Sequence, residues 1–367
     1  MFPSTPPDTG RDPWSDGGRP APPGPPRGVA PHGRGVVPSQ SAAPHPEPEG
    51  GSEPGRRRER AGGRASRRGP DRGAEPTGGE DAETPQDEVE PVPIRRPLSV
   101  AIAGFAALLG IGLVFGAQTA GPGSARIPFA VVVFGVQVLF VLAWTMAIRP
   151  PALPVVAVIS LVVAGAADIA AVAPQVASLA PLGYVAAAGF MAGVLGQLVR
   201  PHDRARATDS LGSTLLIMVG VVSFGTLVVL SRIPVGTQAI FVSLAAAGVA
   251  LMVARLTDAV LPWPRLAPQV PRGAAGVVLG AMLGTLTSAV IGIYLVGFTP
   301  TSAAVVGLVS AGTAVLADLA VGYAEAGRQM AGQPPTMWVA RHMQGPLGGF
   351  ALAAPVAYAI SVLFLGT

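Results

Sequence analysis

Carboxylates with arginines nearby are the side chains in this chain best suited to chemistry. Asp258 follows the end of one apolar stretch, and Asp318 lies near the end of another, in the segment AVLADLAVGYAEAG. Glu325 comes seven residues after Asp318 and so lies on a similar helix face. These oxygen ligands are suited to Mg²⁺ and, through it, to a nucleotide or pyrophosphate. The alternative is a neutralised cluster in which the carboxylates pair with Arg328 or Arg341.

Two arginines in the connection after Asp258 are candidates for phosphate binding. Arg265 and Arg272 precede the glycine-rich segment GAAGVVLGAMLG, which we expect to open a helix. Free N–H groups at a helix N-terminus and a guanidinium beside them both point at an anion, which suits a phosphate. Prolines at positions 262, 264 and 268 prevent the connection itself from becoming helical. The alternative is that both arginines only mark the cytoplasmic side of the membrane.

Membrane-spanning helices must position these residues. The chain has 367 residues, of which 50% are hydrophobic and 13% are charged. A helix needs roughly 20 apolar residues to cross the hydrocarbon layer, and apolar runs of that kind fill the chain after position 98. We therefore predict an all-α, polytopic integral membrane protein with about nine transmembrane helices. The expected spans are Leu98–Ala117, Pro128–Ile148, Ala152–Val172, Leu179–Val199, Leu211–Leu230, Val235–Ala254, Gly273–Gly297, Thr299–Gly322 and Leu347–Leu365.

The N-terminal part has the opposite composition. Residues 1–97 are rich in Pro, Gly, Arg and acidic residues, and they cannot bury enough apolar surface to offset the entropy of ordering. We predict that they form a disordered cytoplasmic tail before a transmembrane domain, residues 98–367. The segment GRRRERAGGRASRRGPDRG could attract anionic lipid headgroups, although an acidic stretch beside it partly cancels its charge. Because no aromatic residues are interleaved with these arginines, no nucleic-acid partner is expected.

The placement of arginines predicts the orientation in the membrane. All 25 basic residues are arginine, and the chain has no lysine. Arg95 and Arg96 stand just before the first span, which places the N-terminus in the cytoplasm. Alternate connections then hold most other arginines, whereas the opposite connections hold only Arg126 and Arg232. An odd number of spans predicts a multi-pass protein of the cell (plasma) membrane with a cytoplasmic N-terminus and an external C-terminus.

Other candidate sites are few. Asp168 is the one carboxylate that we place within a span, and an ionisable group inside a membrane indicates a functional site by default. It lies about one turn before Pro174, where the carboxylate could instead simply reach water. The absence of cysteine excludes disulfides and thiolate metal sites. No P-loop, nucleophile elbow or zincin motif occurs in the chain.

Three segments near the C-terminus are similar to motifs of one enzyme family. LAPQVPRGAAGVVLGAMLG resembles an Ala-Pro…Ser-Pro-Lys-Lys-(Thr/Ser)-Trp-Glu-Gly stretch that opens a glycine-rich helix. AVLADLAVGYAEAG resembles a Gly-Asp-Leu segment, and GPLGGFALAAPVAYAI resembles a His-Gly-Gly segment that continues into Ala-Ala-Pro-Val. Over about residues 240–365 the chain thus resembles the phosphatidate cytidylyltransferase (CDP-diacylglycerol synthase) family. The resemblance implies a reaction of CTP with phosphatidate that uses Mg²⁺, forms CDP-diacylglycerol and releases pyrophosphate.

The resemblance implies roles for individual residues. Asp318 matches the aspartate of Gly-Asp-Leu, a metal or nucleotide ligand, and Asp258 matches an aspartate upstream. Arg272 stands in place of one lysine of the Lys-Lys pair, and Gly348 and Gly349 match the glycines of His-Gly-Gly. Combined with the spacing of the carboxylates, this predicts that Asp258 and Asp318 are catalytic and bind metal, and that Glu325 is a third metal ligand. The predicted phosphate-binding residues are Arg265, Arg272, Gly348 and Gly349.

Departures from the family motifs leave the activity open. Leu347 replaces the histidine, and Glu325 and Ala326 replace a Lys-Arg pair. Cytidylyl transfer needs carboxylates to hold Mg²⁺ and cations to take the charge of the leaving pyrophosphate. A homo-oligomer would offer a way to supply missing ligands from a second subunit. We therefore predict a cytidylyltransferase-like membrane protein of phospholipid metabolism and leave open whether it is an enzyme.

Two alternatives stand beside this prediction. The first is a catalytically silent membrane protein that binds lipid or a partner enzyme. The second is a small-solute transporter, which would place polar residues and broken helices at the bilayer midplane. The middle of each predicted span is almost wholly Ala, Val, Leu and Gly, which argues against transport.

Overall fold

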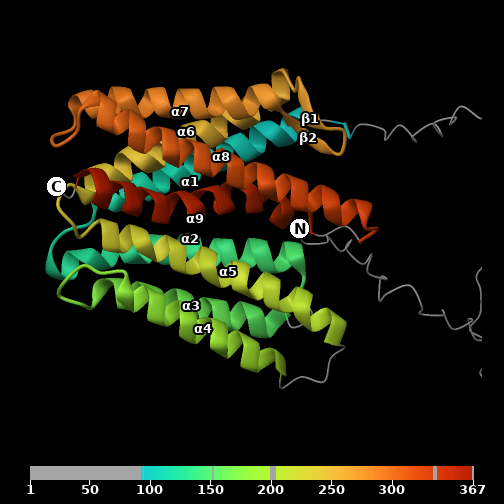
Figure 1. Cartoon of the computed structure of the whole chain (residues 1–367), viewed down its shortest axis with the longest axis horizontal. Coiled ribbons are helices and arrows are strands. Elements are labelled where there is room, and N and C mark those ends of the chain that lie inside the picture. The colour runs from blue at the N-terminus through green and yellow to red at the C-terminus, as the bar shows by residue number, and fades with distance from the viewer. Residues whose placement is uncertain (1–91, 94, 151–152, 199–203, 334–336, 366–367) are drawn as a thin grey trace, which may run out of the picture. The chain divides into compact units, whose positions relative to one another are not determined.

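Helices make up nearly all of the chain that the structure describes (Figure 1). The computed structural model describes residues 92–93, 95–150, 153–198, 204–333 and 337–365, so most of the predicted tail lies outside the described residues. Within these ranges there are nine α-helices. They are α1 Arg96–Gln118, α2 Ile127–Ile148, α3 Leu153–Val172, α4 Ala180–Leu198, α5 Arg204–Leu230, α6 Gly236–Val260, α7 Ala274–Tyr294, α8 Pro300–Met330 and α9 Trp338–Leu365.

Each predicted span coincides with one of these helices, and the all-α polytopic fold is confirmed. Eight helices are long and apolar enough to cross a membrane, and a ninth apolar helix, Ala180–Gly196 within α4, is shorter. The protein is therefore a multi-pass membrane protein.

The start of helix α8 is defined by a capping box. The Ser302 N–H donates to Thr299 Oγ1, and the Thr299 N–H donates to Ser302 Oγ.

The helices lie side by side and alternate in direction, so their connections gather at two ends (Figure 1). The hairpin end carries two short strands, β1 Arg265–Ala267 and β2 Val270–Gly273; α1 and α9 begin at this end, and α6 and α8 finish there. The far end holds the connections 119–126, 173–179, 231–235 and 295–299, the first of which contains the 3₁₀ helix η1, Gly123–Arg126. Helix α9 packs against α6 and α8 on one side and against α2 and α5 on the other.

Helices α5, α6, α8 and α9 extend farther at the hairpin end than the predicted spans. Helix α8 continues to Met330 rather than stopping at Gly322, and α9 begins at Trp338 rather than Leu347. Much of the stretch between these two predicted spans, residues 323–346, is therefore helical. Ala, Glu, Arg, Gln and Met favour helix, so the helices can continue after the apolar run ends.

The connection between α6 and α7 is a β-hairpin. Strands β1 and β2 are antiparallel, with Arg265 opposite Gly273 and Ala267 opposite Val270. The prediction that prolines keep this connection from being helical is confirmed, but its strands were not predicted. The hairpin is tied to the start of the described chain, because the Val92 N–H donates to the Pro268 carbonyl at 3.1 Å.

Candidate functional site

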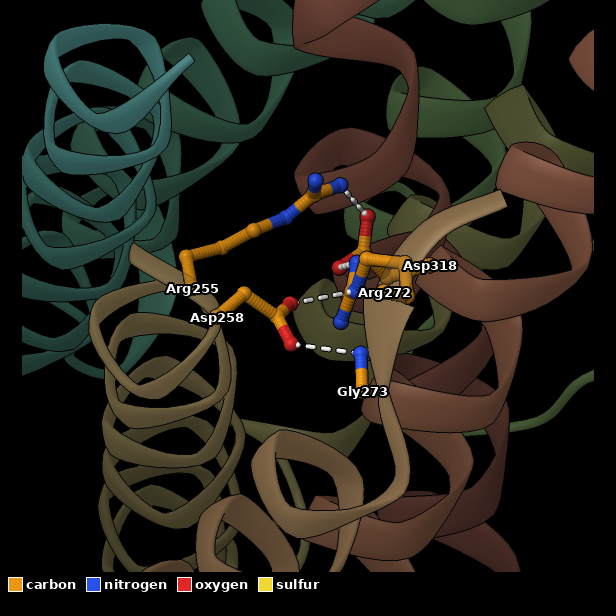
Figure 2. Close-up of polar contacts among 5 residues, drawn as sticks. All are labelled: Arg255, Asp258, Arg272, Gly273 and Asp318. Carbon is orange, nitrogen blue, oxygen red and sulfur yellow. Dashed lines mark hydrogen bonds and ion pairs between the residues drawn. The ribbon is translucent and has the colours of Figure 1, made fainter. Parts of the chain in front are cut away.

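Four charged side chains from α6, β2 and α8 meet inside the hairpin end (Figure 2). Arg272 lies between two aspartates. Its Nη1 donates to Asp318 Oδ2, and its Nε lies 2.7 Å from Asp258 Oδ2 in an ion contact. Arg255 donates from Nη2 to the other oxygen of Asp318. Asp318 and Arg272, to which the sequence analysis gave roles in one candidate site, are therefore in direct contact. We call Arg255, Asp258, Arg272 and Asp318 the charge cluster.

Local structure at the start of α7 places Asp258 in this cluster. Its Oδ1 accepts the backbone N–H of Gly273 at 2.9 Å, one residue before α7 begins. Gly276 allows the close approach, because a Cβ there would lie 2.6 Å from Asp258 Oδ1 and 2.8 Å from the Ala254 carbonyl. Helix N-termini attract anions. The anion at the start of α7 is thus the carboxylate of Asp258, at the place where a phosphate was predicted.

The charge cluster is buried and electrically balanced. Arg272 and Asp258 are each 1% exposed, Asp318 is fully buried, and the side chain of Arg255 is 15% exposed. Burial by itself would lower the pKa of Arg272, but the carboxylates of Asp318 and Asp258 outweigh burial and raise that pKa. Arg272 therefore stays positively charged. Two cations and two anions sum to zero, which is the condition under which charges are tolerated in an interior.

This donor set does not fit Mg²⁺. Both oxygens of Asp318 accept from guanidinium groups, while those of Asp258 contact Arg272 and the Gly273 N–H. A hard cation needs carboxylate oxygens that are free to coordinate it. Across the described ranges, no group of three or more His, Cys, Asp or Glu side chains could hold a metal ion. Two of the three predicted metal ligands, Asp258 and Asp318, thus both contact Arg272 instead of lying together around a metal ion.

Glu325, the third predicted metal ligand, belongs to a separate cluster. Its carboxylate accepts from Arg328, from Gln329 at 3.0 Å and from Arg341 at 3.1 Å. Glu325 lies seven residues beyond Asp318, or roughly 10 Å along the axis of α8. The alternative that carboxylates here pair with Arg328 and Arg341 is confirmed for Glu325, whereas Asp318 pairs with other arginines.

The remaining predicted site residues lie outside the charge cluster. Arg265 donates from Nη1 to the Val92 carbonyl at 3.0 Å and so holds the chain that precedes α1. Gly348 packs against the ring of Trp144, to which an added Cβ would approach within 3.2 Å. A Cβ at Gly349 would lie 2.9 Å from the Ala314 carbonyl. Close helix packing accounts for both glycines, and phosphate binding by them stays a prediction.

Two residues of this region were missed by the sequence analysis. Arg255 precedes Asp258 by three residues on α6, and this spacing alone could have indicated that both face the same neighbour. Gly345 lies against the cluster from α9, where a Cβ would come within 1.8 Å of Asp318 Oδ1 and 3.0 Å of Arg255 Nη2. No local pattern marks Gly345, because its role arises only from the crossing of α9 over α8.

A groove between α2, α5, α8 and α9 is the second feature of the hairpin end. It encloses about 460 Å³ and is mostly apolar. Three of its lining residues have a buried polar atom without a hydrogen-bond partner in the described part of the chain: Trp144 Nε1, Gln344 Oε1 and Arg328 Nε. Arg328 also donates from Nη1 to the Ala147 carbonyl at 3.4 Å, near the last turn of α2.

Asp168 faces the interior of the bundle. It is 6% exposed, so the alternative that it simply reaches water does not hold. Its Oδ1 accepts from Gln137 Nε2 at 3.2 Å, and the same amide nitrogen donates to the Val221 carbonyl at 3.1 Å. This polar contact therefore joins α3 to α2 and α5 rather than forming part of either feature of the hairpin end.

Comparison with known proteins gives no further assignment. Neither the protein-family models nor the curated proteins with which the chain was compared match it. The resemblance to cytidylyltransferases therefore rests on the three sequence motifs and stays a prediction.

Proposed function

We propose that the protein binds an anionic phospholipid at the hairpin end. One acyl chain would lie in the groove between α2, α5, α8 and α9, and the phosphate would meet Arg328. This is the catalytically silent, lipid-binding alternative of the sequence analysis. The observation that carries it is that three buried polar atoms in one apolar groove have no hydrogen-bond partner among the described residues.

The size and lining of the groove suit an acyl chain. Its volume of about 460 Å³ falls within the roughly 300–1,000 Å³ of ligand pockets. Along α8 the lining runs from Ala317 to Arg328, which corresponds to roughly 16 Å of helix. Phe140, Leu216 and Leu352 provide apolar walls from the other three helices. An elongated apolar ligand with one charged end matches this distribution.

The polar atoms of the groove suit the glycerol and phosphate part of a phospholipid. The Trp144 N–H can donate to an ester or phosphate oxygen, and Gln344 Oε1 can accept from a hydroxyl. An unmet buried donor or acceptor costs about 1–3 kcal/mol, so a ligand that meets them is favoured. Arg328, Arg341 and Glu325 together carry one excess positive charge, which suits an anionic headgroup. Phosphatidate, the lipid that the motif resemblance implies, has this chemistry.

A phosphatidate cytidylyltransferase is the second candidate function. The convergence of Asp258, Arg272 and Asp318, all matched to family motifs, favours it. Their mutual ion pairs argue against it, because the carboxylates would have to leave arginine before they could hold the Mg²⁺ that CTP needs. Lipid binding requires no such rearrangement, and it is the proposal that we prefer.

Tryptophan fluorescence tests the lipid proposal. The chain has four tryptophans, and replacing Trp14, Trp263 and Trp338 by Phe leaves Trp144, which lines the groove, as the sole fluorophore. The full chain in nanodiscs would receive phosphatidate or phosphatidylcholine brominated at the same acyl positions. We expect phosphatidate to quench Trp144 more strongly. Equal quenching by both lipids, or none by either, would contradict the proposal.

Three further variants test which parts of the groove bind the headgroup and which bind the acyl chain. Arg328→Gln should remove the preference for phosphatidate while acyl-chain quenching persists. Ala320→Phe fills the groove and should reduce quenching by both lipids. Arg149→Gln, which removes an exposed arginine just after α2, is the matched control for loss of a positive charge and should leave the preference unchanged.

A further inference from the structure

Two arginines converge on the C-terminus of α3 at the far end. Arg232, from the connection between α5 and α6, donates to the carbonyls of Ala171 and Pro174, and to that of Gln175 at 3.2 Å. Arg126, at the end of η1, donates to the Val172 carbonyl at 3.4 Å. Two guanidinium groups from different connections therefore meet at one helix end.

Among the described residues, no hydrogen bond or ion pair joins these two cations to a carboxylate; Asp168 of α3 accepts from Gln137 instead. The far-end connections 119–126, 173–179, 231–235 and 295–299 contain no Asp or Glu. The C-terminus of a helix carries roughly half a negative charge, which offsets only part of two full positive charges. Burial, and after it the charge of Arg126, lowers the pKa of Arg232. Repulsion from Arg126 is the smaller of these two causes.

Capping of α3 explains part of this arrangement but not all of it. The three carbonyls bound by Arg232 occupy only Nη1 and Nη2, and its Nε is buried with no partner in the described ranges. A guanidinium has five N–H donors in a planar fork that matches phosphate. Arg126 binds the Val172 carbonyl through a single N–H group of its Nη1, so both arginines keep N–H donors that the end of α3 does not occupy.

We propose that Arg126 and Arg232 form a binding site for a phosphate group, supplied by a phospholipid headgroup of the leaflet at the far end. The surroundings favour a lipid as the source, because Ile127, Ile169 and Val176 beside the site expose 53%, 69% and 77% of their surfaces. Apolar side chains next to paired arginines are typical of the boundary between acyl chains and headgroups. The site lies at the opposite end from the groove and does not depend on it.

A fluorophore near the arginines tests this site. Because the chain has no cysteine, Ser124→Cys introduces a single labelling position in η1, where Ser124 is exposed. The labelled full chain in phosphatidylcholine nanodiscs would receive phosphatidylglycerol or phosphatidylcholine, each with the same nitroxide near its ester groups. We expect stronger quenching by phosphatidylglycerol. Arg126→Gln, which keeps Arg232 on α3, should weaken this preference by about fivefold, the factor for one arginine near the lipid surface.

Controls separate the site from general charge attraction and from soluble phosphate. Arg149→Gln, at the hairpin end, should leave the preference intact. A preference that is absent, or that persists in Arg126→Gln and in Arg232→Gln, would overturn the site. In detergent without phospholipid, inorganic phosphate is the second probe. One result would be that phosphate raises the unfolding temperature of the wild type but not of Arg126→Gln, while the protein shows no preference for phosphatidylglycerol over phosphatidylcholine. That result would support an anion site at Arg126 and Arg232 but overturn the lipid as the source of the phosphate.

Discussion

Arg272 of β2 and Asp318 of α8 form a direct ion pair in the protein interior, although 46 residues separate them in the chain. Asp258 of α6 lies against the same guanidinium, so one side chain joins three elements. Because β2 continues directly into α7, this contact also determines where α7 begins relative to α6 and α8. The position of the hairpin thus depends on buried charges as well as on packing.

Removal of Arg272 should destabilise the protein strongly. Arg272→Met leaves the buried carboxylates of Asp258 and Asp318 with only Arg255 to balance their negative charge. Breaking a buried pair in this way costs about 3–5 kcal/mol. Equilibrium unfolding of the purified protein in mixed detergent micelles measures the change. A loss below about 1 kcal/mol would mean that the cluster is not a buried ion-pair network.

A compensated variant separates the loss of a charge from the loss of a contact. Combining Arg255→Met and Arg272→Met with Asp258→Asn and Asp318→Asn removes both cations together with both carboxylates. Replacement of a buried ionic network as a whole is less harmful than removal of one member. We therefore expect the quadruple variant to be more stable than Arg272→Met alone, in contrast to the additive loss that independent sites would give.

Gly345 should tolerate no side chain. A Cβ there would lie 1.8 Å from Asp318 Oδ1, so Gly345→Ala must displace either α9 or the carboxylate. Overpacking of this kind costs about 1–3 kcal/mol. Gly327→Ala on α8 is the matched control, because a Cβ at Gly327 meets no atom within 4 Å and alanine favours helix. Equal stability of the two variants would show that α9 does not approach Asp318 this closely.

The spans were predictable because they follow from local composition. A run of about 20 apolar residues defines a transmembrane helix wherever it occurs, so α1–α9 match the predicted spans. The sequence analysis assigned Asp318 and Arg272 to one candidate site, but it did not predict their ion pair, and their neighbours Arg255 and Gly345 depend on how α6, α8 and α9 cross. Such crossings are set by packing and are invisible in a local pattern.

Glu325 shows why spacing alone did not define a site. A separation of seven residues places Asp318 and Glu325 on a similar face of α8, but different neighbours surround them. Asp318 meets arginines from α6 and β2, whereas Glu325 meets Arg328 and Arg341. The strands of the hairpin were also missed: its prolines indicated a non-helical connection, but they did not indicate which of its residues pair as β1 and β2.

The lipid-binding proposal predicts phosphatidate binding without cytidylyl transfer. Purified protein in detergent with phosphatidate, Mg²⁺ and labelled CTP should form no CDP-diacylglycerol, because Asp258 and Asp318 are occupied by arginines. An authentic synthase in a parallel reaction shows that the conditions support turnover. Formation of product that disappears in Asp318→Asn would instead establish an enzyme, and its loss in Arg272→Ala as well would show that arginine replaces the lysine of the family motif.

We also propose that the hairpin end faces the cytoplasm, because Arg95, Arg255, Arg265, Arg272, Arg328 and Arg341 all lie there, whereas the far end holds Arg126 and Arg232. Two single-cysteine variants test this orientation in a chain that otherwise has no cysteine. In intact cells, a membrane-impermeant thiol reagent should label Ser124→Cys at the far end. It should label Gln333→Cys, after α8, only when the membrane is permeabilised. The reverse pattern would place the groove and the charge cluster on the outer side, and the phosphatidate proposal would then require a lipid of the outer leaflet.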